Sequence, residues 1–325
     1  MKNLNFYSLL VFVMAAGLTF SACSKDNDGG SGSGIITPTV KPQAGADARY
    51  VITDMSSDID FIELTKDMHY IVSESDSYYT TKSVDEPRVV EGTYTIKDGV
   101  YYLEGWGTMV VRTTEEGVEL DVTPIGATQA ITLTADYEKP LITDNNAKKL
   151  CKSWMYKAFN IKMRIFLKNF DKDYTPENMD QMPADIKAFI LSAVPSSMRP
   201  AIEDMDFGEI THSIDMEGFD MKRTFTTYGT VVGQNERRTE IDYWRWYDQK
   251  NGIIWIGHNL DRFENLGDKE VESIFAVSYR GTQLCLTLAG FDMQTMMGMD
   301  LPEILNKLLD ASMDFSAAMI FDPAK

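Results

Sequence analysis

The sequence contains few of the residues that build metal centres and nucleophilic active sites. Only three of its 325 residues are histidine and three are cysteine. It has no His-Glu-x-x-His, Cys-x-x-Cys, phosphate-loop or Gly-x-Ser-x-Gly motif. His69, His212 and His258 are far apart in sequence, whereas metal ligands usually show local spacing. We therefore predict no metal, no cofactor and no enzymatic activity. A glycosidase-type carboxylate pair is the catalytic alternative that remains open, because sequence spacing does not reveal one.

Positive charge is also scarce. The chain has 31 Lys and Arg against 49 Asp and Glu, a net charge of −18. The phosphates of a nucleic acid require a basic protein face, so nucleic acid is excluded as a partner. The same balance argues against adhesion to anionic head groups through overall charge.

Long apolar runs are nearly absent, and the one exception lies at the start. Residues 6–20 form a continuous apolar run behind Lys2. A run of about 15 residues is short for a membrane span, which needs roughly 20, but it suits a secretory signal. The small residues Ser21 and Ala22 then lead into Cys23. We predict that residues 1–22 are a signal peptide.

The stretch Leu18-Thr19-Phe20-Ser21-Ala22-Cys23 resembles the lipobox of bacterial lipoproteins, with Phe20 in place of the usual leucine. Acidic residues soon after the cysteine resemble the surface-export tag of Bacteroidetes lipoproteins. The resemblance implies lipidation of Cys23, an outer-membrane location on the periplasmic or surface side, and the membrane as partner through that anchor. The alternative is an ordinary signal peptide followed by a chance cysteine. Residues 23–45 include a Gly/Ser run and are predicted to be a flexible, lipidated linker.

Residues 46–140 are predicted to form an antiparallel β domain. Residues 118–122 alternate strictly between apolar and acidic side chains, which is typical of a strand with one buried face. Asp98-Gly99 is a strong signal for a tight hairpin. The predicted strands are 49–54, 61–64, 69–72, 90–96, 100–103, 106–111, 118–122 and 130–135.

Residues 144–325 are predicted to form a second β domain with helical insertions. A short helical turn capped by Thr143-Asp144 precedes a strand over 150–163. Helices are predicted near 175–205 and near 300–313. The remaining predicted strands are 224–232, 240–247, 253–258, 273–279, 283–288 and 312–321.

A helical turn followed by a tryptophan on the first strand resembles the start of lipocalin-like barrels. Trp154 matches that tryptophan, and Lys152 stands where the family has glycine. The resemblance implies an antiparallel barrel. The predicted fold class is therefore mainly β with helical insertions (α+β), with antiparallel meanders that form a lipocalin-like barrel or half-barrels in two β-rich halves.

An aromatic cluster on strand 240–247 is the predicted ligand site. Trp244 and Trp246 share one face of that strand, and the other face carries Tyr243, Arg245 and Tyr247. A two-residue turn at Asn251-Gly252 would add Trp255 to the face of Trp244, whereas another loop length would exchange the faces. The residues predicted to contact ligand are Tyr243, Trp244, Arg245, Trp246, Tyr247 and Trp255.

Cys151 and Cys285 are the cysteines that remain once Cys23 is lipidated. A disulfide between them fits an oxidising periplasm, and two buried free thiols are the alternative. Sequence does not supply the Cα separation that would decide between the two.

Two functions follow from these features. The first is a lipid-anchored cell-envelope binding protein for a small lipophilic or aromatic ligand, with helices that cover a cavity edged by Trp244, Trp246 or Trp255. The second is a surface-exposed interaction or glycan-contacting lipoprotein of an outer-membrane assembly, with exposed aromatic side chains and no deep pocket. The identity of any protein partner stays open.

Overall fold

A computed structural model describes residues 46–74, 88–115, 117–205, 207, 221–235, 238–258, 260, 274–289 and 313–324. The predicted signal peptide, Cys23 and the linker lie outside these residues. The helix predicted near 300–313 and His212 also lie outside them.

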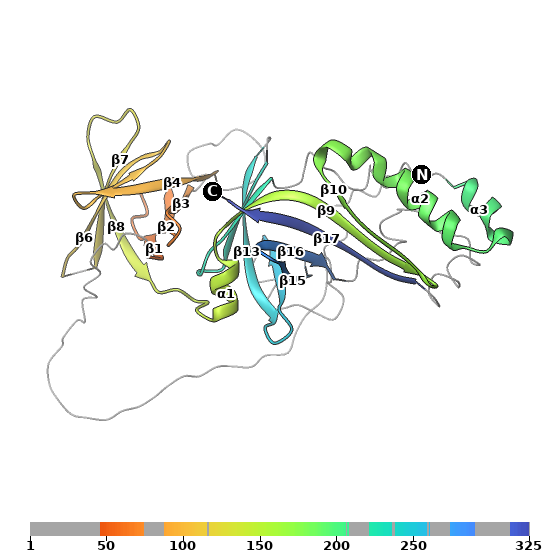
Figure 1. The fold of residues 1–325 in the computed structure, drawn as a ribbon. Coiled ribbons are helices and arrows are strands. Elements are labelled where there is room, and N and C mark those ends of the chain that lie inside the picture. Colours follow the sequence, from red (N-terminus) through yellow and green to blue (C-terminus); the bar gives the residue numbers. More distant parts are fainter. Residues whose placement is uncertain are drawn as a thin grey trace, which may run out of the picture.

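The first half is a closed antiparallel barrel of eight strands (Figure 1). Each strand pairs with the next along the chain, and β1 pairs with β8 to close the ring. The strands are β1 (Ala48–Ile52), β2 (Ile59–Leu64), β3 (His69–Glu74), β4 (Arg88–Lys97), β5 (Val100–Leu103), β6 (Gly107–Thr113), β7 (Val118–Pro124) and β8 (Ile131–Glu138).

Alternation of side chains builds the core of this first barrel. In β7, Val118, Leu120 and Val122 are buried and the residues between them are half-buried, as the sequence pattern predicts. Asp98 and Gly99 both have positive φ, at 52° and 81°. This is the geometry of the tight hairpin turns that match strand twist, so the predicted hairpin is confirmed.

The second half forms a nine-stranded antiparallel sheet in which β9 also pairs with β17, so that eight strands close into a barrel. The ninth strand, β10, pairs along the outer part of β9. The strands are β9 (Ser153–Ile165), β10 (Lys168–Tyr174), β11 (Lys222–Phe225), β12 (Thr230–Gln234), β13 (Thr239–Asp248), β14 (Ile253–Gly257), β15 (Ile274–Arg280), β16 (Gln283–Leu288) and β17 (Met313–Pro323). The predicted fold class, mainly β in two β-rich halves, is confirmed.

Two elements of the second half differ from the sequence prediction. The stretch 224–232 is a hairpin, in which β11 and β12 pair around a turn at Gly229 with φ of 78°. Strand β10 was not predicted, because it carries two aspartates and two lysines, and these charged side chains weaken the apolar signal of a strand.

The helices begin where the capping residues predict. Asp144 accepts hydrogen bonds from the backbone N–H groups of Asn146 and Ala147 and starts α1 (Asn145–Leu150). Thr175 caps the 3-10 helix η1 (Pro176–Gln181), which leads into α2 (Met182–Ala193). A second 3-10 turn, η2 (Ser196–Met198), leads into α3 (Arg199–Glu203). In the described part of the chain no helix is both long enough and apolar enough to cross a bilayer.

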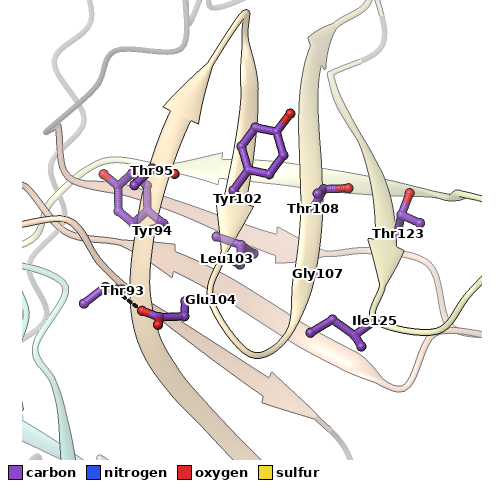
Figure 2. Close-up of a pocket in the computed structure, with 10 residues that line it drawn as sticks. All are labelled: Thr93, Tyr94, Thr95, Tyr102, Leu103, Glu104, Gly107, Thr108, Thr123 and Ile125. Atoms are coloured by element: carbon purple, nitrogen blue, oxygen red, sulfur yellow. Dashed lines mark hydrogen bonds between the residues drawn. The ribbon is translucent and has the colours of Figure 1, made fainter.

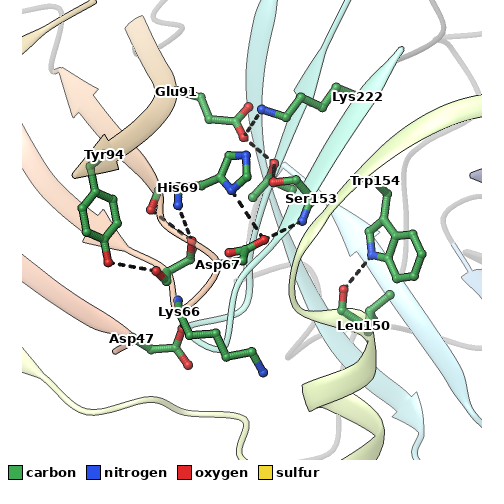
Figure 3. A network of polar contacts seen from close by, with 12 residues as sticks. Asp47, Lys66, Asp67, His69, Glu91, Tyr94, Leu150, Ser153, Trp154 and Lys222 are labelled. Carbon is green, nitrogen blue, oxygen red and sulfur yellow. Dashed lines mark hydrogen bonds and ion pairs between the residues drawn. The ribbon is translucent and has the colours of Figure 1, made fainter. Parts of the chain in front are cut away.

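A polar interface joins the two barrels (Figure 3). The carboxylate of Glu91 on β4 pairs with Lys222 on β11 at 2.9 Å and accepts a hydrogen bond from Thr224. The carboxylate of Asp67 accepts a hydrogen bond from the backbone N–H of Ser153 at 3.2 Å. Beside these contacts lies an apolar cluster in which Phe61, Ile71 and Val89 of the first barrel pack with Val232 of the second.

Candidate functional site

A pocket of about 500 Å³ opens on the outer wall of the first barrel (Figure 2). It spans β4 to β7 and continues into the turn after β7. Two large apolar side chains line it and remain accessible: Tyr102 is 44% exposed and Ile125 is 70% exposed. Accessible aromatic surface inside a concavity is the usual starting point for a ligand site.

Strand register sets three threonines in a row with Tyr102 across this pocket. Thr95 on β4 lies opposite Tyr102 on β5, and Tyr102 in turn lies opposite Thr108 on β6. Thr108 lies opposite Thr123 on β7. Because directly opposed residues point to the same face of a sheet, the tyrosine ring is flanked by threonine hydroxyls.

Glu104 lies at one edge of the pocket (Figure 2) and is fixed by two hydrogen bonds. Its carboxylate accepts a hydrogen bond of 2.5 Å from the hydroxyl of Thr93, and its backbone carbonyl accepts one of 2.6 Å from the buried Tyr70. Glu104 is the charged side chain among the residues that line the pocket. The described residues that line the pocket therefore offer negative charge and no positive charge to a ligand.

Close approach of β6 to β7 shapes the pocket floor. A Cβ atom added to Gly107 would lie 2.3 Å from the carbonyl oxygen of Thr123, which is far inside van der Waals contact. Only glycine allows the two strands to come this close, which keeps Thr123 beside Thr108 in the row.

This arrangement can bind a ligand through apolar contact and through hydrogen bonds. Each threonine hydroxyl can donate one hydrogen bond and accept others, and the exposed tyrosine ring supplies a flat apolar surface. A ligand with an apolar face and several hydroxyl groups matches both features.

The aromatic cluster predicted as the ligand site lies on β13, in the second barrel. The Trp244 side chain is fully buried and packs edge-on against Trp246, with ring centroids 5.5 Å apart. Its indole N–H donates to the carbonyl of Thr226 at 3.0 Å. The Trp246 indole N–H donates to Asp144 at 2.9 Å and so ties β13 to the start of α1. These two tryptophans are part of the barrel core.

For Trp255 the alternative with exchanged faces holds. Trp255 lies opposite Arg245, on the other face from Trp244, and its side chain is 4% exposed. Pairing resumes with Asp248 opposite Ile253, so residues 249–252 make the connection, and a bulge leaves Tyr247 unopposed. The four-residue connection shifts the register by two residues, which keeps the faces, and the bulge adds a shift of one residue, which exchanges them.

Arg245 has a structural role in the turn between β11 and β12. Its guanidinium donates to the carbonyls of Gly229 at 3.2 Å and Trp244 at 2.8 Å. Tyr243 is half-buried, opposite Gly257, whereas Tyr247 is 55% exposed. Of the six predicted residues, only Tyr247 is classed as exposed.

Cys151 and Cys285 are free cysteines in the structure, so a disulfide between them is absent. Cys151 belongs to the core of the second barrel, and burial raises the pKa of its thiol. Cys285 is half-buried between the fully buried Leu284 and Leu286 on β16, so strand alternation points its side chain away from that core.

The histidines that the structure describes each lie beside one aspartate. The Nδ1 atom of His69 is 3.5 Å from Asp67, and that of His258 is 2.5 Å from Asp242. Among the described residues, no three His, Cys, Asp or Glu side chains are grouped as metal ligands would be.

Sequence reasoning missed the Tyr102 pocket, although a signal for it was present. Tyr101 and Tyr102 are adjacent on one strand, so one of them must point outward. Tyr101 is 2% exposed and belongs to the core, which leaves Tyr102 on the surface. The sequence alone does not show that threonines from two other strands lie beside it.

The fold and the pocket together define a two-barrel β protein whose architecture is compatible with ligand binding. No protein-family model matches the chain, and neither a curated protein nor a solved structure does so. The barrel architecture is compatible with the resemblance to lipocalin-like proteins seen at Trp154.

Proposed function

We propose that the protein is a lipid-anchored binding protein of the bacterial cell envelope, held at the outer membrane through Cys23, and that it binds a glycan at the Tyr102 pocket. The observation that carries this proposal is the row of Thr95, Tyr102, Thr108 and Thr123 across the pocket. A sugar ring presents an apolar face that can stack on the tyrosine, while its hydroxyl groups bond to the threonines.

The charge of the pocket narrows the class of glycan. Glu104 is acidic and no basic side chain is among the described residues that line the pocket, so a uronic or sialic acid would face repulsion. Neutral sugars and amino sugars fit this environment. The proposal therefore concerns neutral or amine-bearing glycans.

A lipophilic ligand inside the second barrel is less well supported. Around Trp244 the described part of the interior is filled by Phe225 and Trp246, whose ring centroids lie 6.1 Å and 5.5 Å from that of Trp244.

The test is a glycan array followed by titration calorimetry with the sugars that bind. Tyr102→Ala is expected to weaken binding at least tenfold, which corresponds to a loss of about 1.4 kcal/mol. Tyr247→Ala, which removes an exposed tyrosine of the second barrel, is the matched control and should bind as the wild type does. If no glycan binds, or if Tyr247→Ala reduces binding and Tyr102→Ala does not, the pocket is not the site.

The anchor is tested independently of the ligand. Radiolabelled palmitate should enter the wild type and not Cys23→Ala, and the variant should leave the membrane fraction or retain its signal peptide. An acylated cysteine with more than one chain gives stable anchoring, whereas one myristoyl chain would be marginal. A variant that loses its signal peptide and still stays in the membrane fraction would contradict the lipoprotein assignment.

A further inference from the structure

The hairpin between β9 and β10 ends in an exposed apolar tip. In Figure 1, β9, β10 and β17 run together away from the first barrel. Ile165 pairs with Lys168 at the end of this arm, so Phe166 and Leu167 form the two-residue turn. Leu167 is 97% exposed and Phe166 is 43% exposed. Two large apolar side chains at a solvent-facing turn are unfavourable in water unless something covers them.

The backbone at this tip is also strained. Phe166 has φ of 54°, and Leu167 is not among the residues with positive φ. A two-residue turn with positive φ only at its first position normally has glycine there, because a Cβ atom is disfavoured in that conformation. A bulky aromatic residue here costs folding stability and gains no described core contact. Strain retained at an exposed position points to a function of the side chain.

Basic side chains lie close behind the apolar tip. Lys162 and Arg164 on β9 are 56% and 60% exposed, and Lys168 follows Leu167 directly. Asp171 and Asp314 lie within ion-pair distance of Lys162 and Arg164. Lys168 is held by the carbonyl of Ser192 at 2.5 Å, so its ammonium group stays near the tip.

We propose that this tip is a membrane-contact element that inserts Phe166 and Leu167 into the interfacial region of a lipid bilayer. Aromatic and aliphatic side chains at a turn fit the boundary between head groups and acyl chains. The flanking cations fit the phosphates at the same depth, where lysine and arginine side chains reach outward to water. The basic side chains that flank the apolar turn favour a bilayer over a protein partner.

The net charge of −18 does not oppose this contact, because insertion depends on the apolar tip and not on overall attraction. Phosphatidylethanolamine and phosphatidylcholine carry phosphates without net charge, so they are the lipids of choice for the test. The proposal rests neither on the Tyr102 pocket nor on lipidation of Cys23. Either of those assignments can fail while this one stands.

The experiment is vesicle co-sedimentation of the chain from Ser24 to Lys325. This form keeps every described residue and omits the apolar run at residues 6–20, which would itself enter vesicles. Vesicles are made of phosphatidylethanolamine and phosphatidylcholine. Phe166→Gly combined with Leu167→Asn removes the apolar tip and supplies residues that suit the turn. Met55→Ser, at a 97% exposed methionine of the β1–β2 turn, is the control for loss of any exposed apolar side chain.

We expect the wild type and Met55→Ser to sediment with vesicles and the tip variant to lose at least fivefold in bound fraction. Thermal unfolding should show the tip variant to be as stable as the wild type or more so, because glycine relieves the strain at residue 166. Bromine-labelled lipid should quench the added fluorescence of Leu167→Trp. A wild type that stays in the supernatant, or a tip variant that sediments equally, overturns the proposal.

Discussion

The carboxylate of Glu63, in the first barrel, accepts a hydrogen bond of 2.7 Å from the hydroxyl of Thr230, in the second. The same carboxylate pairs with Arg49 of its own barrel at 3.1 Å, and its side chain is fully buried. Burial raises the pKa of Glu63, and the charge of Arg49 with the hydrogen bond from Thr230 opposes that rise. One oxygen of this buried acid is thus contacted from both barrels at once.

Substitution at this junction should weaken the whole fold. Glu63→Ala leaves Arg49 and Thr230 without their buried partner, and such a loss costs about 3–5 kcal/mol. Thr230→Val removes one hydrogen bond to a charged group, worth about 1.5–3 kcal/mol. Chemical denaturation of the two single variants and the double variant measures their coupling. Strict additivity of the two effects would contradict the contact.

Asp67 should make stability depend on acid pH. Burial by itself raises the pKa of Asp67, but hydrogen bonds from His69, Thr65 and the backbone of Ser153, together with the charge of His69, lower it to about 2. Since this value lies below the ordinary one of 3.8, the stabilisation is present above pH 4 and is lost as the pH falls toward 2.

The size of this effect is about 2 kcal/mol at most, because the side chain is 29% exposed and solvent screens part of it. The free energy of unfolding, measured by denaturation between pH 2 and pH 7, should fall steeply at acid pH, and Asp67→Asn should reduce this fall. Asp180→Asn, at an exposed acid of η1, is the control and should leave the fall unchanged. An equally steep fall in Asp67→Asn would argue against this role.

Gly107→Ala should disturb both folding and binding. The added methyl group would lie 2.3 Å from the Thr123 carbonyl oxygen, and backbone atoms there cannot swing aside. Overpacking of this kind typically costs 1–3 kcal/mol. Thermal unfolding measures the loss, with the half-exposed Thr108→Ala as the neighbouring control for stability. A fully stable Gly107→Ala would show that β6 and β7 can separate at this point.

Cys151 and Cys285 should react as two free thiols. In a Cys23→Ala background, denatured protein should react at two thiols without any reductant. In the native state, Cys285 should be alkylated faster than Cys151, because Cys151 is buried and its pKa is raised. Peptide mapping by mass spectrometry reports both rates. A cross-linked peptide containing residues 151 and 285 would contradict the structure.

Local features of the sequence determined much of the secondary structure. Asp98-Gly99 forms the predicted hairpin because its backbone conformation is set by two residues alone. Asp144 and Thr175 start the helical segments that their caps predict, again through bonds to residues two or three positions away. The alternation in β7 already identified which side chains face a core. These features depend on neighbours along the chain, so the sequence by itself was sufficient.

Tertiary structure decided which faces and strands come together. A bulge at Tyr247 moved Trp255 to the face of Arg245, because a one-residue shift inverts every side chain beyond it. The closure of β9 on β17 joins segments about 160 residues apart through a register that no local pattern encodes. The same is true of the pocket, where Tyr102 meets Thr108 and Thr95 only because three strands align. The face that a side chain occupies follows from the two-residue period of its strand. The strand with which it pairs follows from loop geometry and barrel closure.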